Sequence, residues 1–261
     1  MNVPPGACDC HVHVFGPAAR YPLAPDRAYT PPEASVESLV NLQDELGFER
    51  VVLVQPSVYG TDNSCTLDAL KALGSRARAV AVVDEFSAFA DLHAAGVRGV
   101  RVNLQTGNLR DPMLVAHAAA RVAPLGWHVE TFARIATLNE LKPLPTTLVI
   151  DHFGLPRDQS DCDYLVRLIR SQDVYVKLSG IQRLPMDPGP LVQALVAAAP
   201  ERCVWGSDWP HPVSTPRNPK TLQPFDAIDD LASLERLQGW IPDGTLLRKI
   251  LVDNPARLYD F

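Results

Sequence analysis

Residues 8–15 are Cys-Asp-Cys-His-Val-His-Val-Phe, a short β-rich run that ends just before a proline-rich segment. Similar runs recur along the chain, separated by stretches with apolar residues at helical spacing. The predicted strands are 8–15, 50–54, 79–83, 97–102, 128–132, 147–150, 174–178 and 203–206. The clearest predicted helices are 35–46, 66–73, 86–95, 113–125 and 190–199.

Strands that alternate with helices imply parallel pairing through right-handed crossovers. Eight such units in 261 residues predict one α/β domain over residues 1–261, a (β/α)₈ TIM barrel. The active face of such a barrel lies at the carboxyl ends of its strands. An open doubly wound sheet is the alternative, but no G-x-G-x-x-G or Walker loop follows any predicted strand.

Composition excludes several classes of function. Hydrophobic residues make up 46% of the chain, and 24 basic against 30 acidic residues give a formal charge of −6. This charge gives no support for binding nucleic acid or an anionic membrane. No apolar run approaches the roughly 20 residues that a membrane span needs, and the N-terminus lacks a signal-peptide pattern. Five dispersed cysteines predict reduced thiols and a cytoplasmic protein.

The first predicted strand carries Asp9, His11 and His13 at a spacing of two. Alternation along a strand predicts that the three side chains share one face. A single histidine would more often be an ordinary core or surface residue. Two on one apolar strand indicate a function, because burying both imidazoles without a task costs desolvation free energy.

Two further strand ends carry polar residues. Asp151 and His152 follow the sixth predicted strand, although Asp151 could instead cap a helix or turn. Asp208 follows the last strand among two tryptophans and two prolines. Apolar surroundings raise the basicity of a carboxylate, so we predict that Asp208 is a general base. The alternative for Asp208 is a plain turn residue.

The prolines concentrate in segments 17–32 and 210–224, which follow the first and the last predicted strand. Because these strands close the barrel, the two loops should lie side by side. They are either two rigid connections or two walls of one substrate pocket.

The motifs together resemble the lactonase branch of the amidohydrolase superfamily. The similarity runs through nearly the whole chain, in order and spacing. It is carried by residues 9–17, 29–31, 54–57, 60–63, 98–103, 205–212 and 254–259. The resemblance implies a (β/α)₈ hydrolase that opens the ring of a carboxylated lactone, such as a pyrone dicarboxylate, a sugar lactone or a muconolactone.

The resemblance also implies hydrolysis without a metal. The fourth strand ends near Arg101, whose charge would repel a metal ion, and the fifth strand offers no clear histidine ligand. The alternative is a mononuclear zinc site of His11, His13, Glu130 and Asp208, formed if Glu130 points inward.

Lactone hydrolysis needs an activated water, a polarised carbonyl group and a proton for the leaving oxygen. We expect Asp208 to be the base. His11, His13 and His152 are expected to donate hydrogen bonds to the oxyanion. Asp9 is expected to orient a histidine of the first strand.

The substrate is expected to be a small anionic lactone. Arg101 should bind its carboxylate, because a guanidinium binds carboxylate through two hydrogen bonds. The resemblance adds Arg183 as a second carboxylate binder and Ser57 and Tyr29 as hydroxyl contacts.

The chain departs from the branch at two positions. Arg110 either replaces an arginine of the branch or is solvated, and Phe132 stands where the branch has a tyrosine, so a less acidic lactone fits as well. Rival functions are a metal-dependent hydrolase or decarboxylase on the same scaffold, and a non-catalytic binding protein. The sequence leaves the oligomeric state open.

Overall fold

A single sheet of eight parallel strands forms the centre of the molecule, and the strands follow one another in chain order. The structure is a computed structural model that describes residues 3–106, 110–213 and 217–261. The strands are β1 (Cys8–Val12), β2 (Arg50–Val54), β3 (Ala77–Ala81), β4 (Val97–Asn103), β5 (His128–Phe132), β6 (Leu148–Ile150), β7 (Val174–Leu178) and β8 (Cys203–Trp205). The predicted TIM barrel is confirmed.

The sheet closes just beyond β8. The backbone N–H of His13 donates to the carbonyl of Trp209 at 2.8 Å, and that of Asp208 donates to the carbonyl of His11 at 2.9 Å. The barrel is therefore nearly closed, and Asp208 lies against the carboxyl end of β1.

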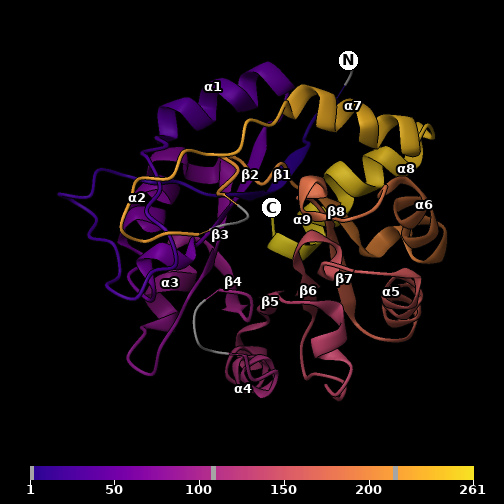
Figure 1. Ribbon diagram of the computed structural model, residues 1–261, viewed down its shortest axis with the longest axis horizontal. Coiled ribbons are helices and arrows are strands. Elements are labelled where there is room, and N and C mark those ends of the chain that lie inside the picture. The colour runs from indigo at the N-terminus through magenta and orange to yellow at the C-terminus, as the bar shows by residue number, and fades with distance from the viewer. Residues whose placement is uncertain (1–2, 107–109, 214–216) are drawn as a thin grey trace.

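The helices surround the strands (Figure 1). They are α1 (Val36–Leu46), α2 (Ser64–Leu73), α3 (Phe89–Ala95), α4 (Met113–Val122), α5 (Gln159–Ser171), α6 (Gly189–Ala198), α7 (Asp230–Trp240), α8 (Gly244–Arg248) and α9 (Asn254–Tyr259). The five predicted helices correspond to α1, α2, α3, α4 and α6. Ser35 caps α1 by accepting a hydrogen bond from the N–H of Ser38 at 3.1 Å.

The boundaries of five strands differ from the prediction, by the most in β1 and β3. β1 ends at Val12 and not at Phe15, because the backbone of Phe15 pairs with Ala34 of the following loop. β3 begins at Ala77, two residues earlier than predicted, because Ala77 already pairs with Val51.

Apolar side chains fill the barrel interior away from the carboxyl ends of the strands, and polar groups lie at those ends. The inner cluster consists of Cys8, Cys10, Val52, Val54, Val80, Val149, Tyr175, Val204 and Tyr259. Tyr259 belongs to α9, so the last helix closes the barrel at the end opposite to the predicted site. No helix in the described ranges is long and apolar enough to cross a membrane.

The loops that follow β1 and β8 lie side by side, as predicted (Figure 1). The Thr30 hydroxyl donates to the carbonyl of Pro219 at 2.8 Å. The N–H of Gln223 donates to the carbonyl of Thr30 at 2.8 Å. Residues 214–216 of the second predicted loop lie outside the described residues.

Candidate active site

A β-bulge in β1 decides which of its side chains face the site. Asp9 pairs with Val51 and Val12 with Leu53, so three residue steps on β1 match two on β2. The extra residue breaks the alternation. Asp9 faces α1, where it accepts from the Gln43 amide at 3.3 Å. The prediction that Asp9 shares a face with His11 and His13 is therefore wrong.

Asp9 still supports the site from behind. Its Oδ1 accepts from the N–H of His11 at 3.2 Å and from the N–H of Ser207 at 2.9 Å. It thus ties the backbones of β1 and the segment after β8 together, next to the histidine it was expected to orient.

Three imidazole nitrogens converge on one oxygen of Asp208. The Nε2 atoms of His11, His13 and His152 lie 3.8, 3.8 and 3.7 Å from Asp208 Oδ1. All four side chains are buried. Within the described residues, Oδ1 has no hydrogen-bond partner. The four residues predicted to be catalytic thus surround one point at the barrel mouth.

The other oxygen of Asp208 is bound by a guanidinium. Arg183 donates to Oδ2 through Nε at 2.9 Å and through Nη2 at 2.6 Å. Burial by itself would raise the pKa of Asp208, but Arg183 and then the surrounding histidines outweigh it and hold the pKa well below its usual range. The prediction that the surroundings raise the basicity of Asp208 is therefore wrong for the protein with Arg183 bound to Asp208. Trp205, one of the two tryptophans near Asp208 in the sequence, stacks its ring on that of Phe48.

The Nδ1 atoms of His13 and His152 each lie within hydrogen-bond distance of a neighbouring oxygen. His13 Nδ1 lies 2.7 Å from the carbonyl oxygen of Val54, and burial lowers the pKa of His13 to about 3. Because a carbonyl can only accept, Nδ1 carries the proton and the neutral ring presents a lone pair at Nε2. This geometry makes His13 an acceptor and not the donor expected. His152 Nδ1 lies 2.9 Å from the Ser179 hydroxyl, and burial lowers the pKa of His152 to about 4.

Unusual backbone geometry holds these side chains in place. His152 and Phe153 have φ of 51° and 57°, and Asp208 has φ of 69°. Such left-handed conformations are rare outside glycine and persist where the surroundings enforce them. A Cβ on Gly180 would lie 2.6 Å from His152 Nδ1, so only glycine leaves room for this ring.

A layer of buried charges lies beneath the histidines. Lys177 Nζ donates to Glu130 Oε2 at 2.5 Å, and Arg101 Nη2 donates to Asp151 Oδ2 at 3.1 Å. Burial and then Asp151 raise the pKa of Glu130 to about 8, against the opposing effect of Lys177. Sequence reasoning missed Lys177, although a lysine inside the apolar strand β7 was the available signal.

Twelve of the described residues line the cavity above this layer. They are His13, Tyr29, Pro56, Ser57, Arg101, Asn103, Phe132, His152, Arg183, Asp208, Pro212 and Arg217. All four predicted substrate contacts are among them.

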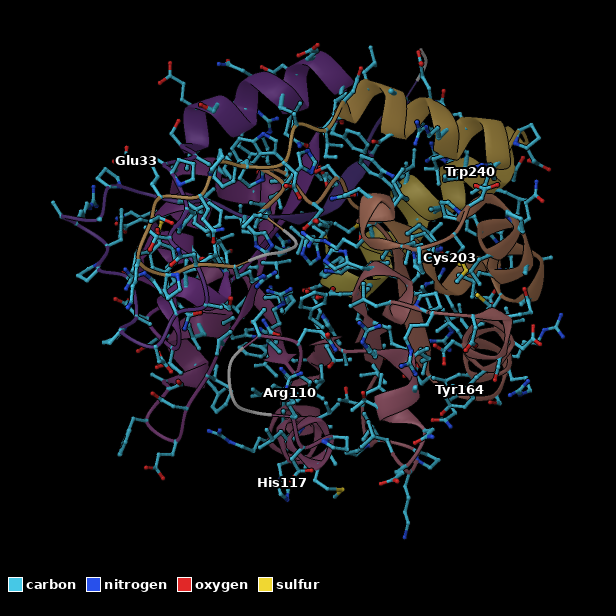
Figure 2. All side chains as sticks on the ribbon, viewed as in Figure 1. Glu33, Arg110, His117, Tyr164, Cys203 and Trp240 are labelled. Carbon is cyan, nitrogen blue, oxygen red and sulfur yellow. The ribbon has the colours of Figure 1, made fainter. Side chains whose placement is uncertain are left out.

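Arg217 is a charged residue of this lining that sequence reasoning missed. Its guanidinium carbon lies 5.1 Å from the centre of the Tyr29 ring, across the two adjoining loops. Arg110, by contrast, is exposed and does not line the cavity (Figure 2).

Two sets of side chains in the described residues could hold a metal ion. They are His11, His13 and Asp208, and His11, Asp151 and His152, with ligand atoms within 4.8 Å of one another in each set. Glu130, the predicted additional ligand, is in neither set. A cation already contacts members of both sets, because Lys177 Nζ lies 3.2 Å from His11 Nδ1 and Arg183 binds Asp208. The residues therefore fit a metal ion poorly.

Comparison with known proteins gives a consistent result. A family profile described as Amidohydrolase matches residues 8–261. A 2-pyrone-4,6-dicarboxylate hydrolase from Comamonas testosteroni is 38% identical, over 99% of this chain and 92% of its own. A 4-sulfomuconolactone hydrolase from Rhizobium radiobacter is 37% identical, over 98% and 91%. A probable 2-pyrone-4,6-dicarboxylic acid hydrolase from Acinetobacter baumannii, solved with citric acid bound, superposes with a TM-score of 0.79 at 28% identity, over 98% and 100%.

Proposed function

The chain belongs to the amidohydrolase family, and on that premise we propose that it hydrolyses the ring ester of a carboxylated lactone. One observation carries the proposal. Three imidazole nitrogens surround the free oxygen of Asp208 in a cavity that is also lined by three arginines. The relatives act on pyrone dicarboxylate and sulfomuconolactone, by their names, and both substrates are anionic lactones.

Asp208 and His13 hold the attacking water. Asp208 Oδ1 and the Nε2 lone pair of His13 are both hydrogen-bond acceptors that face the same point. Asp208 takes a proton from the water molecule while the water oxygen attacks the carbonyl carbon of the lactone. The ring C–O bond then breaks in the tetrahedral intermediate, and Asp208 returns the proton to the leaving oxygen.

In this proposal His11 and His152 donate hydrogen bonds to the carbonyl oxygen as it becomes an oxyanion. Their Nε2 atoms face the same point from β1 and from the end of β6. Donors that are already in position need no reorganisation when charge develops, and each is worth about 10²–10³-fold in turnover.

Substrate carboxylate binds to Arg183 in place of Asp208. In the free protein Arg183 occupies the cavity and pairs with Asp208 Oδ2. A carboxylate on the lactone offers the guanidinium an equivalent partner. When Arg183 changes partner, Asp208 loses its strongest stabilising contact and becomes a stronger base. Arg101 and Arg217 add positive charge around the same cavity.

We propose that no metal ion takes part. Two of the residues that a metal would use already have a cation on their other polar atom: Lys177 contacts His11 at Nδ1, and Arg183 binds Asp208 at Oδ2. A metal-dependent hydrolase is the second candidate, because His11, His13 and Asp208 have ligand atoms close enough for one ion. Tightly bound metal at one equivalent per chain, in protein purified without added metal, would favour that candidate.

A panel of lactones tests the proposed function. The panel comprises pyrone, muconolactone and sugar lactones that carry a carboxylate, with uncharged lactones of the same ring size as controls. Acid release in a pH-stat measures ring opening. We expect the highest kcat/KM for carboxylated lactones. Equal rates for charged and uncharged rings, or no hydrolysis of any member, would overturn the proposal.

A further inference from the structure

Lys177 is the cation of the buried layer that also contacts a histidine of the site. It is fully buried on β7. Its Nζ lies within hydrogen-bond distance of Glu130 Oε2 and of His11 Nδ1, at 2.5 and 3.2 Å, and 3.6 Å from Asp151 Oδ1. A buried ion pair contributes little net stability compared with apolar residues of the same volume. Stability alone therefore does not account for a lysine at this position.

The contact between Lys177 and His11 determines where the imidazole carries its proton. His11 is fully buried, and the ammonium group of Lys177 lies against its Nδ1. An ammonium group has three donors and no acceptor. Nδ1, at 3.2 Å from Nζ, must then accept, and the proton lies on Nε2.

Asp151 is the competing partner of the same nitrogen. Its Oδ1 lies 3.3 Å from His11 Nδ1 and would favour the opposite tautomer. Yet this oxygen has no hydrogen-bond partner among the described residues, so the two atoms are close without the alignment that a hydrogen bond needs. A proton on Nδ1 would also point at the Lys177 ammonium.

The two histidines of β1 therefore hold opposite tautomers. His13 donates from Nδ1 to the Val54 carbonyl and presents a lone pair at Nε2. His11 accepts at Nδ1 from Lys177 and presents N–H at Nε2, facing Asp208 Oδ1 at 3.8 Å. A metal ion shared by both histidines would require a lone pair at both Nε2 atoms.

We propose that Lys177 is a positioning residue that fixes His11 in the Nε2–H tautomer, so that His11 donates a hydrogen bond to an oxyanion and does not bind a metal ion. The oxyanion part of this inference rests on the proposed lactone hydrolysis; the tautomer itself does not.

Nitrogen-15 NMR of the full-length protein labelled in histidine tests the tautomer directly, without substrate. The His11 signals are assigned by their loss in His11→Gln. We expect Nε2 to be the protonated nitrogen and Nδ1 the unprotonated one, and the reverse for His13. A proton on His11 Nδ1 would overturn the inference, even if the protein proves to be a lactonase. If His11 has the expected tautomer but the protein opens no lactone, the inference about Lys177 holds and the proposed function is wrong.

A pair of variants tests the role of Lys177. Lys177→Met combined with Glu130→Gln removes the ammonium without leaving a buried charge alone, and Glu130→Gln by itself is the matched control. In the double variant we expect the His11 proton to move to Nδ1, toward Asp151, and the affinity for zinc in calorimetry to rise at least about tenfold. The control should keep the wild-type tautomer and affinity. An unchanged His11 tautomer in the double variant would contradict the role of Lys177, and if that variant does not fold, the wild-type spectrum decides.

Discussion

At the scale of single residues, Asp208 has two oxygens with different tasks. Oδ1 faces three imidazoles and lacks a hydrogen-bond partner in the described residues, whereas Oδ2 is bound by Arg183. One oxygen is thus available to a water molecule while the other controls how strongly the carboxylate attracts a proton. Arg183 holds the pKa of the carboxylate low in the free protein, and in the proposed mechanism Asp208 becomes a better base when Arg183 binds the substrate carboxylate.

Asp208→Asn removes the base and keeps the shape of the side chain. Asparagine cannot accept the proton of the attacking water, so we expect kcat to fall by about 10²–10⁴-fold. KM for an anionic lactone should not rise, because Arg101, Arg183 and Arg217 remain and Arg183 no longer has to leave a carboxylate to bind the substrate. Steady-state kinetics on a carboxylated lactone measure both constants. A variant that retains the wild-type kcat would exclude Asp208 as the base.

Arg183→Met should change the pH profile. The pKa of Asp208 is depressed in the wild type, so the carboxylate stays ionised down to below about pH 4, where an ordinary aspartate titrates. Without Arg183, the raising effect of burial is opposed only by weaker neighbours, and the pKa should move up.

The profile of kcat/KM for an uncharged lactone reports this shift, because that substrate does not need the arginine. We expect the acid limb of the profile to move to higher pH in Arg183→Met. An acid limb at the same pH in both proteins would show that the ion pair does not control Asp208.

At the scale of elements, the site is positioned by the contact between β1 and the segment that follows β8, which we call the seam. The bulge in β1 turns Asp9 away from the mouth, and Asp9 then binds the N–H of Ser207 across the seam. A prediction based on strict alternation cannot see such a bulge, because it depends on how two distant segments pair. His11 and His13 reach the site only because the bulge changes which residues face inward.

Gly206 is the tightest point of this seam. A Cβ on Gly206 would lie 2.6 Å from His11 Cβ and 2.7 Å from the His11 backbone nitrogen. Gly206→Ala must therefore push the strands apart, and such overpacking costs roughly 1–3 kcal/mol. We expect a lower free energy of unfolding in denaturant titration together with loss of activity. Gly239→Ala, on a glycine whose added Cβ meets nothing within 4 Å, is the control. Equal stability of the two variants would refute the close contact.

The paired proline-rich loops form one wall of the cavity and carry Arg217. Their contact through Thr30 and Pro219 brings this arginine over Tyr29. We expect Arg217→Met to raise KM for an anionic lactone about tenfold or more, since a hydrogen bond to a charged group contributes roughly 1.5–3 kcal/mol. KM for an uncharged lactone should not change. Arg110→Met, at an exposed arginine outside the cavity, is the matched control. A similar rise in both variants would indicate a general effect of charge and not a contact.

At the scale of the whole molecule, the barrel separates an apolar end closed by α9 from a polar end that carries the chemistry. The order of the strands was predictable, and so was the meeting of His152 with Asp208, because each of these two residues follows a recognisable strand and parallel strands end at one face. The Lys177–Glu130 pair was not predictable from local pattern, since it joins β7 to β5 across the interior. The same holds for the pairing of Arg183 with Asp208.

The rate at which metal-free protein opens a carboxylated lactone tests the central claim most directly. The protein is dialysed against a chelator and its metal content is measured, and kcat/KM is determined before dialysis, after dialysis and after addition of zinc. If Asp208 and the histidines act without a metal ion, kcat/KM is the same in all three states. A rate that collapses on chelation and returns with zinc would contradict the account, because it would show that a metal ion and not the hydrogen-bonding histidines polarises the carbonyl group.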